Sequence, residues 1–394
     1  MQQSNENYFD SLPFGRLGII PLKSCIEMGN KVNNYLYEWR SSRNHELRHN
    51  SSYTGYERDS YIIEAENPRF GSGEAKGCIN ESVRGDDLYV MVDVCNYSLT
   101  YSMFGEENHM SPDDHYQDLK RVIAAIGGKA RRITVIMPFL YESRQHKRNS
   151  RESLDCALAL RELKAMGVDN IITFDAHDER VQNAIPLTGF DSVRPVYQFI
   201  KNILREAEDL TLDSDHLMVI SPDEGGMRRA VYMANNLGVD MGMFYKRRDY
   251  STIKDGKNPI VAHEFLGASV EGKDMIIIDD MISSGDSVLE VSQMLKAKKA
   301  RNIYICSTFG LFTNGLDRFD KAYEDGLFTK IFTTNLIYQP EELLSKSYYV
   351  NCNMSKYIAL LIDTLNHDSS ISALLDPRDR IQNVIRKFKN HEKI

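Results

Sequence analysis

Short apolar runs alternate with amphipathic stretches along most of the chain. Seven runs have the continuous apolar character of buried strands: LYVMVDV from Leu88, ITVIMPFL from Ile133, NIITFDAH from Asn170, HLMVISPD from His216, DMIIIDDM from Asp274, NIYICSTFG from Asn302 and KIFTTNLI from Lys330. Stretches with helical spacing follow several of them, including SLDCALALRELKAMG, PVYQFIKNILREAEDL, MRRAVYMANNLG and DRFDKAYEDG. Strands that are apolar on both faces are typical of parallel sheets covered by helices. The pattern predicts an α/β fold with two mostly parallel sheets, each with helices on both faces.

The segment MIIIDDMISSGDS (residues 275–287) carries the clearest chemical signal. Its first four residues predict a buried strand and the following SVLEVSQMLK predicts a helix, so Ser283 to Ser287 form the turn between them. Such a turn directs backbone N–H groups and a helix dipole at one point, where a phosphate binds well. Asp279 and Asp280, at the end of the strand, are placed to accept hydrogen bonds from sugar hydroxyls. The predicted ligand is a ribose phosphate. The alternative is an ordinary turn, because Ser287 and Glu290 also fit a helix capping box.

Composition narrows the classes of function. The 394 residues are enough for two domains, and 42% hydrophobic with 26% charged residues is typical of a globular protein. A net charge of -8 and a pI near 5.8 argue against a general binder of nucleic acid or of anionic membranes. Any site for an anion must therefore be local.

Cysteine usage and the N-terminus bear on the compartment. The six cysteines lie far apart and lack the close spacing of a zinc site or a redox dithiol. The N-terminus, MQQSNENYFDSLPFG, lacks the plan of a signal peptide, and no apolar run is long enough to span a bilayer. We therefore expect a cytoplasmic protein.

A polar turn near residues 189–195 separates two sets of strands and helices. It predicts an N-terminal domain over residues 1–193 and a C-terminal domain over residues 194–376. The basic segment 377–394 is then expected to be a solvated tail. Two polar stretches without apolar periodicity, 39–59 and 104–115, are expected to be inserted surface loops.

Several segments, in this order, resemble those of the ribose-phosphate pyrophosphokinase (phosphoribosyl pyrophosphate synthetase) family. They are FGSGE (70–74), ESVRG (81–85), YESRQHKR (141–148), FDAHDER (174–180), SPDEGGMRRA (221–230), KRRD (246–249) and DDMISSGDS (279–287). The resemblance implies two phosphoribosyltransferase-like domains. It also implies transfer of the β,γ-pyrophosphoryl group of ATP to the 1-hydroxyl of ribose 5-phosphate, with Mg²⁺ as cofactor.

The same resemblance assigns roles to individual residues. It implies ATP contacts for Glu74, Arg144, Gln145 and His177, magnesium contacts for Asp175, His177 and Asp223, and ribose 5-phosphate contacts for Asp223, Asp279, Asp280, Ser283, Ser284, Gly285, Asp286 and Ser287. Lys246 and Arg248 match cations of a mobile loop that closes over the reacting phosphates. The hairpin with Glu74 implies a homo-oligomer, a dimer-based assembly or a hexamer, because in the family it reaches the adenine of a neighbouring subunit's ATP.

Each assignment has a simpler alternative. RQHKR is charge-rich and fits a solvated basic loop as well as a nucleotide contact, and a histidine at a strand end is commonly a hydrogen-bonded loop residue. Gly225 and Gly226 permit close approach of a ligand or merely a tight turn. For Arg229, one turn inside the following helix, a salt bridge is the expected role.

The chain also departs from the family pattern. Ser72, His146, Ser283, Asp286 and Phe309 stand where the family usually has other residues. The shape of DDMISSGDS keeps open a phosphoribosyltransferase that uses phosphoribosyl pyrophosphate. The departures keep open a non-catalytic regulatory homologue of the synthetase.

Overall fold

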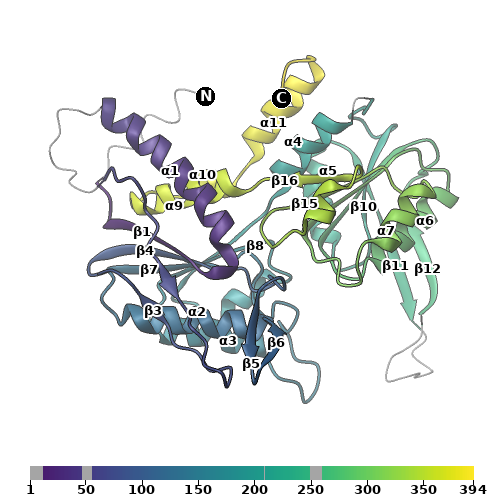
Figure 1. Cartoon of the computed structure of the whole chain (residues 1–394). Coiled ribbons are helices and arrows are strands. Elements are labelled where there is room, and N and C mark those ends of the chain that lie inside the picture. The colour runs from purple at the N-terminus through teal and green to yellow at the C-terminus, as the bar shows by residue number, and fades with distance from the viewer. Residues whose placement is uncertain (1–11, 47–55, 208, 249–259) are drawn as a thin grey trace. The chain divides into compact units, whose positions relative to one another are not determined.

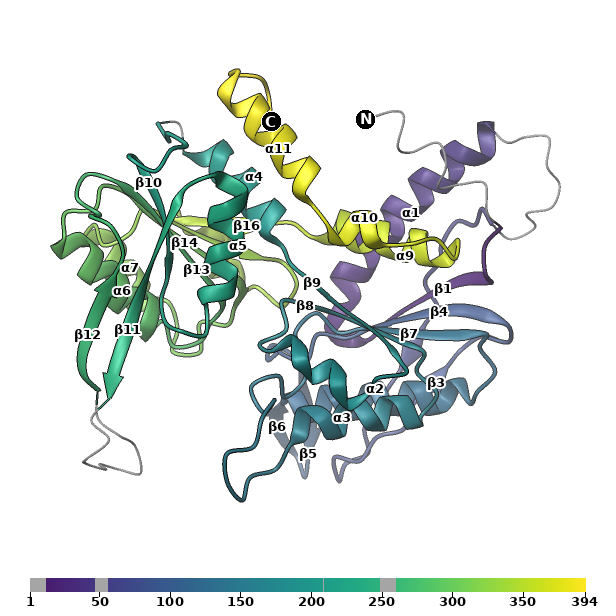
Figure 2. The same cartoon turned by 180° about the vertical axis from the view of Figure 1, so that it is seen from behind.

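The computed structural model describes residues 12–46, 56–207, 209–248 and 260–394, which form two compact units (Figures 1 and 2). Unit 1 consists of residues 1–194, 335–338 and 353–376, and unit 2 of residues 195–334, 339–352 and 377–394. Among the described residues, no helix is long and apolar enough to cross a membrane. All six cysteines are free thiols.

Unit 1 is built on a five-stranded sheet in the order β1-β4-β7-β8-β9, in which every pairing is parallel. Its strands are β1 (Arg16–Pro21), β4 (Asp86–Met91), β7 (Arg132–Ile136), β8 (Asn170–Phe174) and β9 (Gly189–Val193). Helices α1 (Ile26–Glu46) and α9 (Ser355–Asn366) cover one face, while α2 (Pro112–Ile126) and α3 (Asp155–Ala165) cover the other (Figure 1). The short elements are η1 (Lys23–Cys25), η2 (Glu179–Ala184), α10 (Ser372–Leu375) and two hairpins, β2 (Ala65–Glu66) with β3 (Cys78–Ile79) and β5 (Thr100–Met103) with β6 (Glu106–His109).

Unit 2 is built on a seven-stranded sheet in the order β12-β11-β10-β13-β14-β15-β16, in which only the edge pair β11 and β12 is antiparallel. Its strands are β10 (Leu217–Ser221), β11 (Asp240–Arg248), β12 (Ile260–Leu266), β13 (Asp274–Ile282), β14 (Ile303–Gly310), β15 (Lys330–Thr334) and β16 (Tyr349–Cys352). Its helices are α4 (Val196–Glu206), α5 (Met227–Leu237), α6 (Asp286–Ala297), α7 (Asp317–Glu324), α8 (Glu341–Ser345) and α11 (Arg378–Lys389). One core, with Phe199 of α4 and Val384 of α11, covers one sheet face, and a second, with Val291 of α6 and Phe319 of α7, covers the other.

These two sheets confirm the predicted fold class and all seven predicted strands. Both sheets are mostly parallel and carry helices on both faces, as continuous apolar strands require. The four named helical stretches form α3, α4, α5 and α7.

The expected domain over residues 194–376 is wrong for residues 335–338 and 353–376, where the chain returns to unit 1. Residues 335–338 belong to unit 1, where the buried Asp93 carboxylate accepts the backbone N–H of Tyr338 at 2.6 Å. Residues 353–376 also belong to unit 1, since α9 lies against α1. The order of consecutive elements does not reveal these returns, because the contacts that fix them join positions hundreds of residues apart.

A buried polar network holds α9 on α1. The Arg40 guanidinium, 1% exposed, donates to Asp363 Oδ1 from Nε at 3.2 Å and from Nη2 at 3.1 Å, and Arg43 Nη1 lies 2.7 Å from Asp363 Oδ2. Asn366, one helical turn on, accepts from Arg40 at 2.7 Å and donates to Asp87 at 2.8 Å. Burial alone would raise the pKa of Asp363, but Arg40 and Arg43 outweigh it and hold the pKa below its usual range. The carboxylate is therefore ionised inside the unit.

Both expected surface loops are wrong in part. Within 39–59, the chain is helical as far as Glu46, and residues 47–55 lie outside the described residues. Arg40 in this stretch is buried by its pairing with Asp363. The 104–115 stretch is the end of a β-hairpin followed by the start of α2, where Ser111 and Asp114 form a capping box. Both stretches are predicted as loops because their polar residues, which form a helix cap or a buried ion pair, interrupt the apolar periodicity of a helix or strand.

The expected solvated tail is also wrong. Residues 378–389 form α11, and Ile381, Val384 and Ile385 are buried in the core that also contains α4 and α5. These three positions have helical spacing, while the basic residues between them occupy the outer face. The charge of the segment concealed its apolar stripe.

The buried network gives a stability prediction. Asp363→Ala should lower the free energy of unfolding of unit 1 by about 3–5 kcal/mol, because it leaves the buried guanidinium of Arg40 without its carboxylate partner. Urea unfolding followed by the fluorescence of Trp39, the single tryptophan, which lies beside Arg40 on α1, measures the change.

Glu27→Ala is the matched control, since it removes an exposed partner of Lys31 on the same helix and should cost less than about 1 kcal/mol. Because the folded pKa of Asp363 is depressed, its contribution is present above about pH 4 and is lost as the pH falls below that value. Equal midpoints for Asp363→Ala and Glu27→Ala would contradict this account of α9.

Candidate functional site

The turn between β13 and α6 has the predicted form. Strand β13 runs through Asp279 and Asp280 to Ile282, and α6 begins at Asp286 after Gly285. Gly285 has φ +85°, and a Cβ atom there would lie 2.2 Å from Cζ of Phe319 on α7. The turn thus precedes the N-terminus of α6, the end of a helix at which the backbone dipole favours an anion.

Three carboxylates meet at the carboxyl ends of β10 and β13. Asp279 Oδ1 accepts the backbone N–H of Asp280 at 2.8 Å, and Asp280 Oδ1 accepts that of Met281 at 3.0 Å. Burial raises the pKa of Asp279 well above its usual value, and the charges of Asp280 and Asp223 raise it further. Arg229 Nη2 lies 3.6 Å from Asp280 Oδ2. The structure thus brings together four predicted features of unit 2: the turn, Asp279, Asp280 and Asp223. Arg229 forms the salt bridge that is expected of it.

The loop after β10 is closely packed against β13. Gly226 donates its N–H to Asp223 Oδ1 at 3.1 Å, and Ser221 Oγ donates to the Asp223 carbonyl at 2.6 Å. A Cβ atom on Gly226 would lie 2.8 Å from Ser221 Oγ and 3.5 Å from the Ile278 carbonyl. Close packing inside the unit therefore favours glycine at this position, a reason that differs from both predicted roles.

Asp286 is turned toward α7. Its Oδ1 accepts a hydrogen bond from Arg318 Nη1 at 2.5 Å, and its Oδ2 accepts one from Ser284 Oγ at 2.7 Å. The negative charge in the turn is thus offset by Arg318. Sequence reasoning missed Arg318 and Phe319, the two α7 residues that hold the turn, because no local pattern links α7 to it.

A second group of predicted residues lies past the ends of β7 and β8 in unit 1. Arg144 is exposed, in a turn where Gln145 donates its backbone N–H to the Glu142 carbonyl at 2.8 Å. The His146 ring lies 5.2 Å from the His177 ring between centroids, so the two segments meet. Burial lowers the pKa of His146, and the neighbouring His177 lowers it further. Asp175 is buried and has φ +41°, a strained conformation that proteins keep mainly at functional positions.

Glu74 lies in a separate hairpin of unit 1. Arg69 and Ala75 form an antiparallel bridge, and Phe70 donates its N–H to the Glu74 carbonyl at 2.7 Å. The Glu74 side chain accepts a hydrogen bond from Ser72 Oγ at 2.9 Å within the turn. The structure forms the expected hairpin but does not join the Glu74 carboxylate to Arg144 or His177.

Lys246 and Arg248 are not at the start of a loop. Their backbone belongs to β11, with Lys246 opposite His263 and Arg248 opposite Ile260 of β12. The polarity of KRRD suggested a loop, but the antiparallel return of β12 extends the strand through these residues. The rest of the expected mobile loop, residues 249–259, lies outside the described residues.

No group of three Asp, Glu, His or Cys side chains in the described part of the chain could hold a metal ion alone. Magnesium commonly takes only one or two carboxylates and completes its coordination with water and substrate phosphates. The buried strand-end carboxylate of Asp175 fits that arrangement. The residues present therefore suit a magnesium ion that binds together with a nucleotide.

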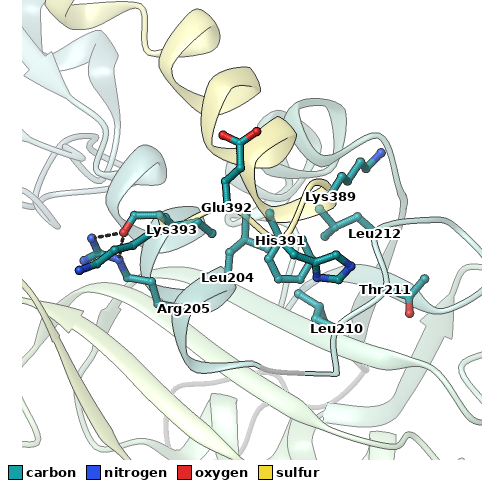
Figure 3. Close-up of a pocket in the computed structure, with 11 residues that line it drawn as sticks. Leu204, Arg205, Leu210, Thr211, Leu212, Lys389, His391, Glu392 and Lys393 are labelled. Carbon is teal, nitrogen blue, oxygen red and sulfur yellow. Dashed lines mark hydrogen bonds between the residues drawn. The ribbon is translucent and has the colours of Figure 1, made fainter.

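A pocket of about 760 Å³ lies between the end of α4 and the segment after α11 (Figure 3). Leu204, Leu210 and Phe388 supply apolar walls, and Arg205 Nη2 donates to the Ile394 carbonyl at 2.7 Å. None of the residues predicted from the sequence to bind substrate lines it.

Comparisons with known proteins first define the class. Residues 17–167 match the N-terminal domain of ribose phosphate pyrophosphokinase, and residues 192–346 match the phosphoribosyl transferase domain. The phosphoribosylpyrophosphate synthetase structure from Mycobacterium smegmatis superposes with a TM-score of 0.69, covering 90% of this chain and 100% of that one at 22% identity. The fold is that of a protein with two phosphoribosyltransferase-type domains.

Curated relatives then identify the family. The chain is 28% identical over 315 residues to a ribose-phosphate pyrophosphokinase of Vibrio parahaemolyticus, which covers 78% of this chain and 90% of the relative. It is 27% identical over 310 residues to one of Mycoplasma genitalium, which covers 78% and 85%. The chain belongs to the ribose-phosphate pyrophosphokinase family. Its identity to these relatives is low, as a divergent member requires.

Gly285 provides a test of the turn. Gly285→Ala should destabilise unit 2 by more than about 2 kcal/mol, because it combines a left-handed residue with a collision against the Phe319 ring. Gly272 separates the two effects, since it has φ +76° but a Cβ atom added there would have no other atom within 4 Å. Gly272→Ala should cost about 1–2 kcal/mol. Thermal unfolding by circular dichroism compares the two, and equal losses would show that Phe319 does not brace the turn.

Proposed function

We propose that this chain is a ribose-phosphate pyrophosphokinase. It transfers the β,γ-pyrophosphoryl group of ATP to the 1-hydroxyl of ribose 5-phosphate and releases AMP. The observation that carries the proposal is the strand, Asp-Asp, turn and helix unit at residues 274–297, in a chain that also matches the N-terminal domain of this family over residues 17–167. The curated relatives bear the name of the same enzyme.

The site of unit 2 suits ribose 5-phosphate. The turn Ser283–Ser287 binds the 5-phosphate through backbone N–H groups and hydroxyls, at the positive end of α6. Asp279 and Asp280 accept hydrogen bonds from the ribose hydroxyls, and Asp223 lies beside them. Hydroxyl donors would relieve part of the mutual repulsion of these carboxylates, which favours binding of a polyhydroxylated ligand.

The site of unit 1 suits ATP. Arg144 and Gln145 contact the nucleotide, His177 contacts the triphosphate, and Glu74 contacts adenine. When bound, magnesium would offset the charge of the phosphates, with Asp175 and His177 as its proposed contacts in this unit; the resemblance assigns a further magnesium contact to Asp223 of unit 2. Lys246 and Arg248, which belong to unit 2, have the proposed role of stabilising the charge that develops on the transferring group.

The reaction needs no covalent intermediate with the protein. The 1-hydroxyl oxygen forms a bond to the β-phosphorus of ATP, the bond from that phosphorus to the bridging oxygen on the AMP side breaks, and the hydroxyl proton is released. Protein groups act by positioning and by electrostatic stabilisation.

Location and assembly belong to the same proposal. The six free thiols support a reducing compartment, for which the cytoplasm is our assignment. A homo-oligomer follows from the family role of the Glu74 hairpin. A net charge of -8 gives no support for nucleic acid as a partner.

Product analysis tests the proposed reaction. With ATP, Mg²⁺ and ribose 5-phosphate, chromatography should show AMP forming at a rate that falls to background when ribose 5-phosphate is omitted. ADP as the product would instead indicate single phosphoryl transfer. Consumption of phosphoribosyl pyrophosphate with a free base, without AMP formation from ATP, would identify a phosphoribosyltransferase. No turnover in any mixture would support a regulatory homologue.

Asp279 and Asp280 test the ribose site. Changing both to Asn should lower kcat/KM for ribose 5-phosphate by roughly a hundred-fold or more, because each change removes a charged acceptor worth about 1.5–3 kcal/mol. The KM for ATP should change much less. Removing two like charges that repel each other should leave the melting temperature unchanged or higher.

Asp325→Asn, at the exposed end of α7, is the matched control in unit 2. It should keep wild-type values for both substrates. A double Asn variant with the same kcat/KM as Asp325→Asn would mean that the turn is only structural.

A further inference from the structure

The β5–β6 hairpin, a polar stretch with no expected role, is joined directly to the turn that contains Glu74. Strands β5 and β6 pair only with each other and stand apart from the five-stranded sheet of unit 1. The backbone N–H of Phe104, at the hairpin tip, donates to the Gly71 carbonyl at 2.8 Å. The two hairpins therefore meet at their tips through a main-chain hydrogen bond.

Side chains on one face of β5 fill the space behind the Glu74 turn. A Cβ atom added to Gly73, which has φ +92°, would lie 2.7 Å from Met103 Sδ and 3.7 Å from Tyr101 Cε2. Gly73 also donates its N–H to the Phe70 carbonyl at 2.8 Å, which closes the turn. Met103 and Tyr101 thus abut the turn at Gly73.

The base of the turn is held from the same face. The Arg69 guanidinium lies 4.6 Å over the Tyr101 ring and 2.8 Å from the Asp118 carboxylate of α2. The Tyr101 hydroxyl donates to Asp114 Oδ1 of α2 at 3.4 Å. Tyr101 therefore links the turn to a helix that packs on the main sheet.

The tip of the β5–β6 hairpin carries an unfavourable residue at an exposed position. Phe104 and Gly105 have φ +52° and +83°, the pattern of a tight hairpin turn that normally selects Asn or Gly at both places. A bulky side chain in this conformation costs free energy, and Phe104 is 82% exposed. Phe70, the residue before its hydrogen-bond partner Gly71, is 56% exposed. Packing against the described residues does not account for Phe104.

We propose that the β5–β6 hairpin is a positioning element for the ATP-contacting turn, with Tyr101 and Met103 as its positioning residues. Tyr101 orients Arg69 at the base of the turn, and Met103 fixes Gly73 near its tip, so that the Glu74 carboxylate is presented in one geometry. The part of this proposal that concerns ATP rests on the proposed function, in which Glu74 contacts adenine. The ordering of the turn can be measured without assuming that function.

Steady-state kinetics of the full chain test the positioning role. Tyr101→Ala and Met103→Ala should each raise the KM for ATP at least fivefold while leaving the KM for ribose 5-phosphate within twofold of wild type. Tyr101→Phe, which keeps the ring under Arg69, and Met103→Leu should restore wild-type values. Ser102→Ala is the matched control, because its exposed side chain points to the opposite face of β5.

Hydrogen exchange supplies a readout that needs no activity. The amides of Phe70 and Gly73, which are hydrogen-bonded within the turn, should exchange at least tenfold faster in Tyr101→Ala than in the wild type or in Ser102→Ala. Suppose that the wild type is active and that Tyr101→Ala leaves both the KM for ATP and the protection of these amides unchanged. That result would overturn the proposal. An inactive wild type with the predicted loss of protection would reject the proposed function and retain the positioning role.

Discussion

Crowding of carboxylates at the end of one parallel strand is the constraint around which the site of unit 2 is organised. Asp279 and Asp280 are consecutive on β13, and Asp223 approaches from β10, so that burial and mutual repulsion raise the pKa of Asp279. The positive charge of Arg229 offsets part of this repulsion, since its Nη2 atom lies 3.6 Å from Asp280 Oδ2. A fold that keeps three such groups together incurs a cost in stability, which the proposed binding of a hydroxyl-rich ligand would offset.

The same principle applies to unit 1 with different chemistry. Parallel strands β7 and β8 end side by side, which brings the His146 and His177 rings to 5.2 Å and leaves Asp175 buried in a strained conformation. This edge combines the two imidazole rings with the exposed Arg144 and the buried Asp175, whereas three carboxylates gather at the ends of β10 and β13. The proposed binding of ATP in unit 1 and of ribose 5-phosphate in unit 2 draws on this difference.

Local patterns predicted the parts of the structure that depend on local chemistry. The buried strands, the turn after Asp280 and the two strand-end clusters follow from apolar runs and from where the chain must leave the sheet. Long-range pairing set the rest. Arg40 is buried because Asp363 lies against it, and the return of residues 353–376 to unit 1 depends on that contact. Arg318 and Phe319 reach the turn from α7, and Lys246 and Arg248 lie in a strand because β12 pairs with it. No pattern of residue spacing in the sequence predicts these long-range contacts. The catalytic roles assigned to Lys246 and Arg248 stay predictions.

The central claim is that an intact pyrophosphoryl group moves from ATP to the sugar. Its most direct test is a double-label experiment with [γ-³²P]ATP, [¹⁴C]ribose 5-phosphate and Mg²⁺, in which the labelled products are separated and counted. The account predicts one product that carries both labels in equal molar amounts, with no ³²P in orthophosphate above background. Recovery of ³²P in orthophosphate, or in a sugar product formed together with ADP, would contradict it.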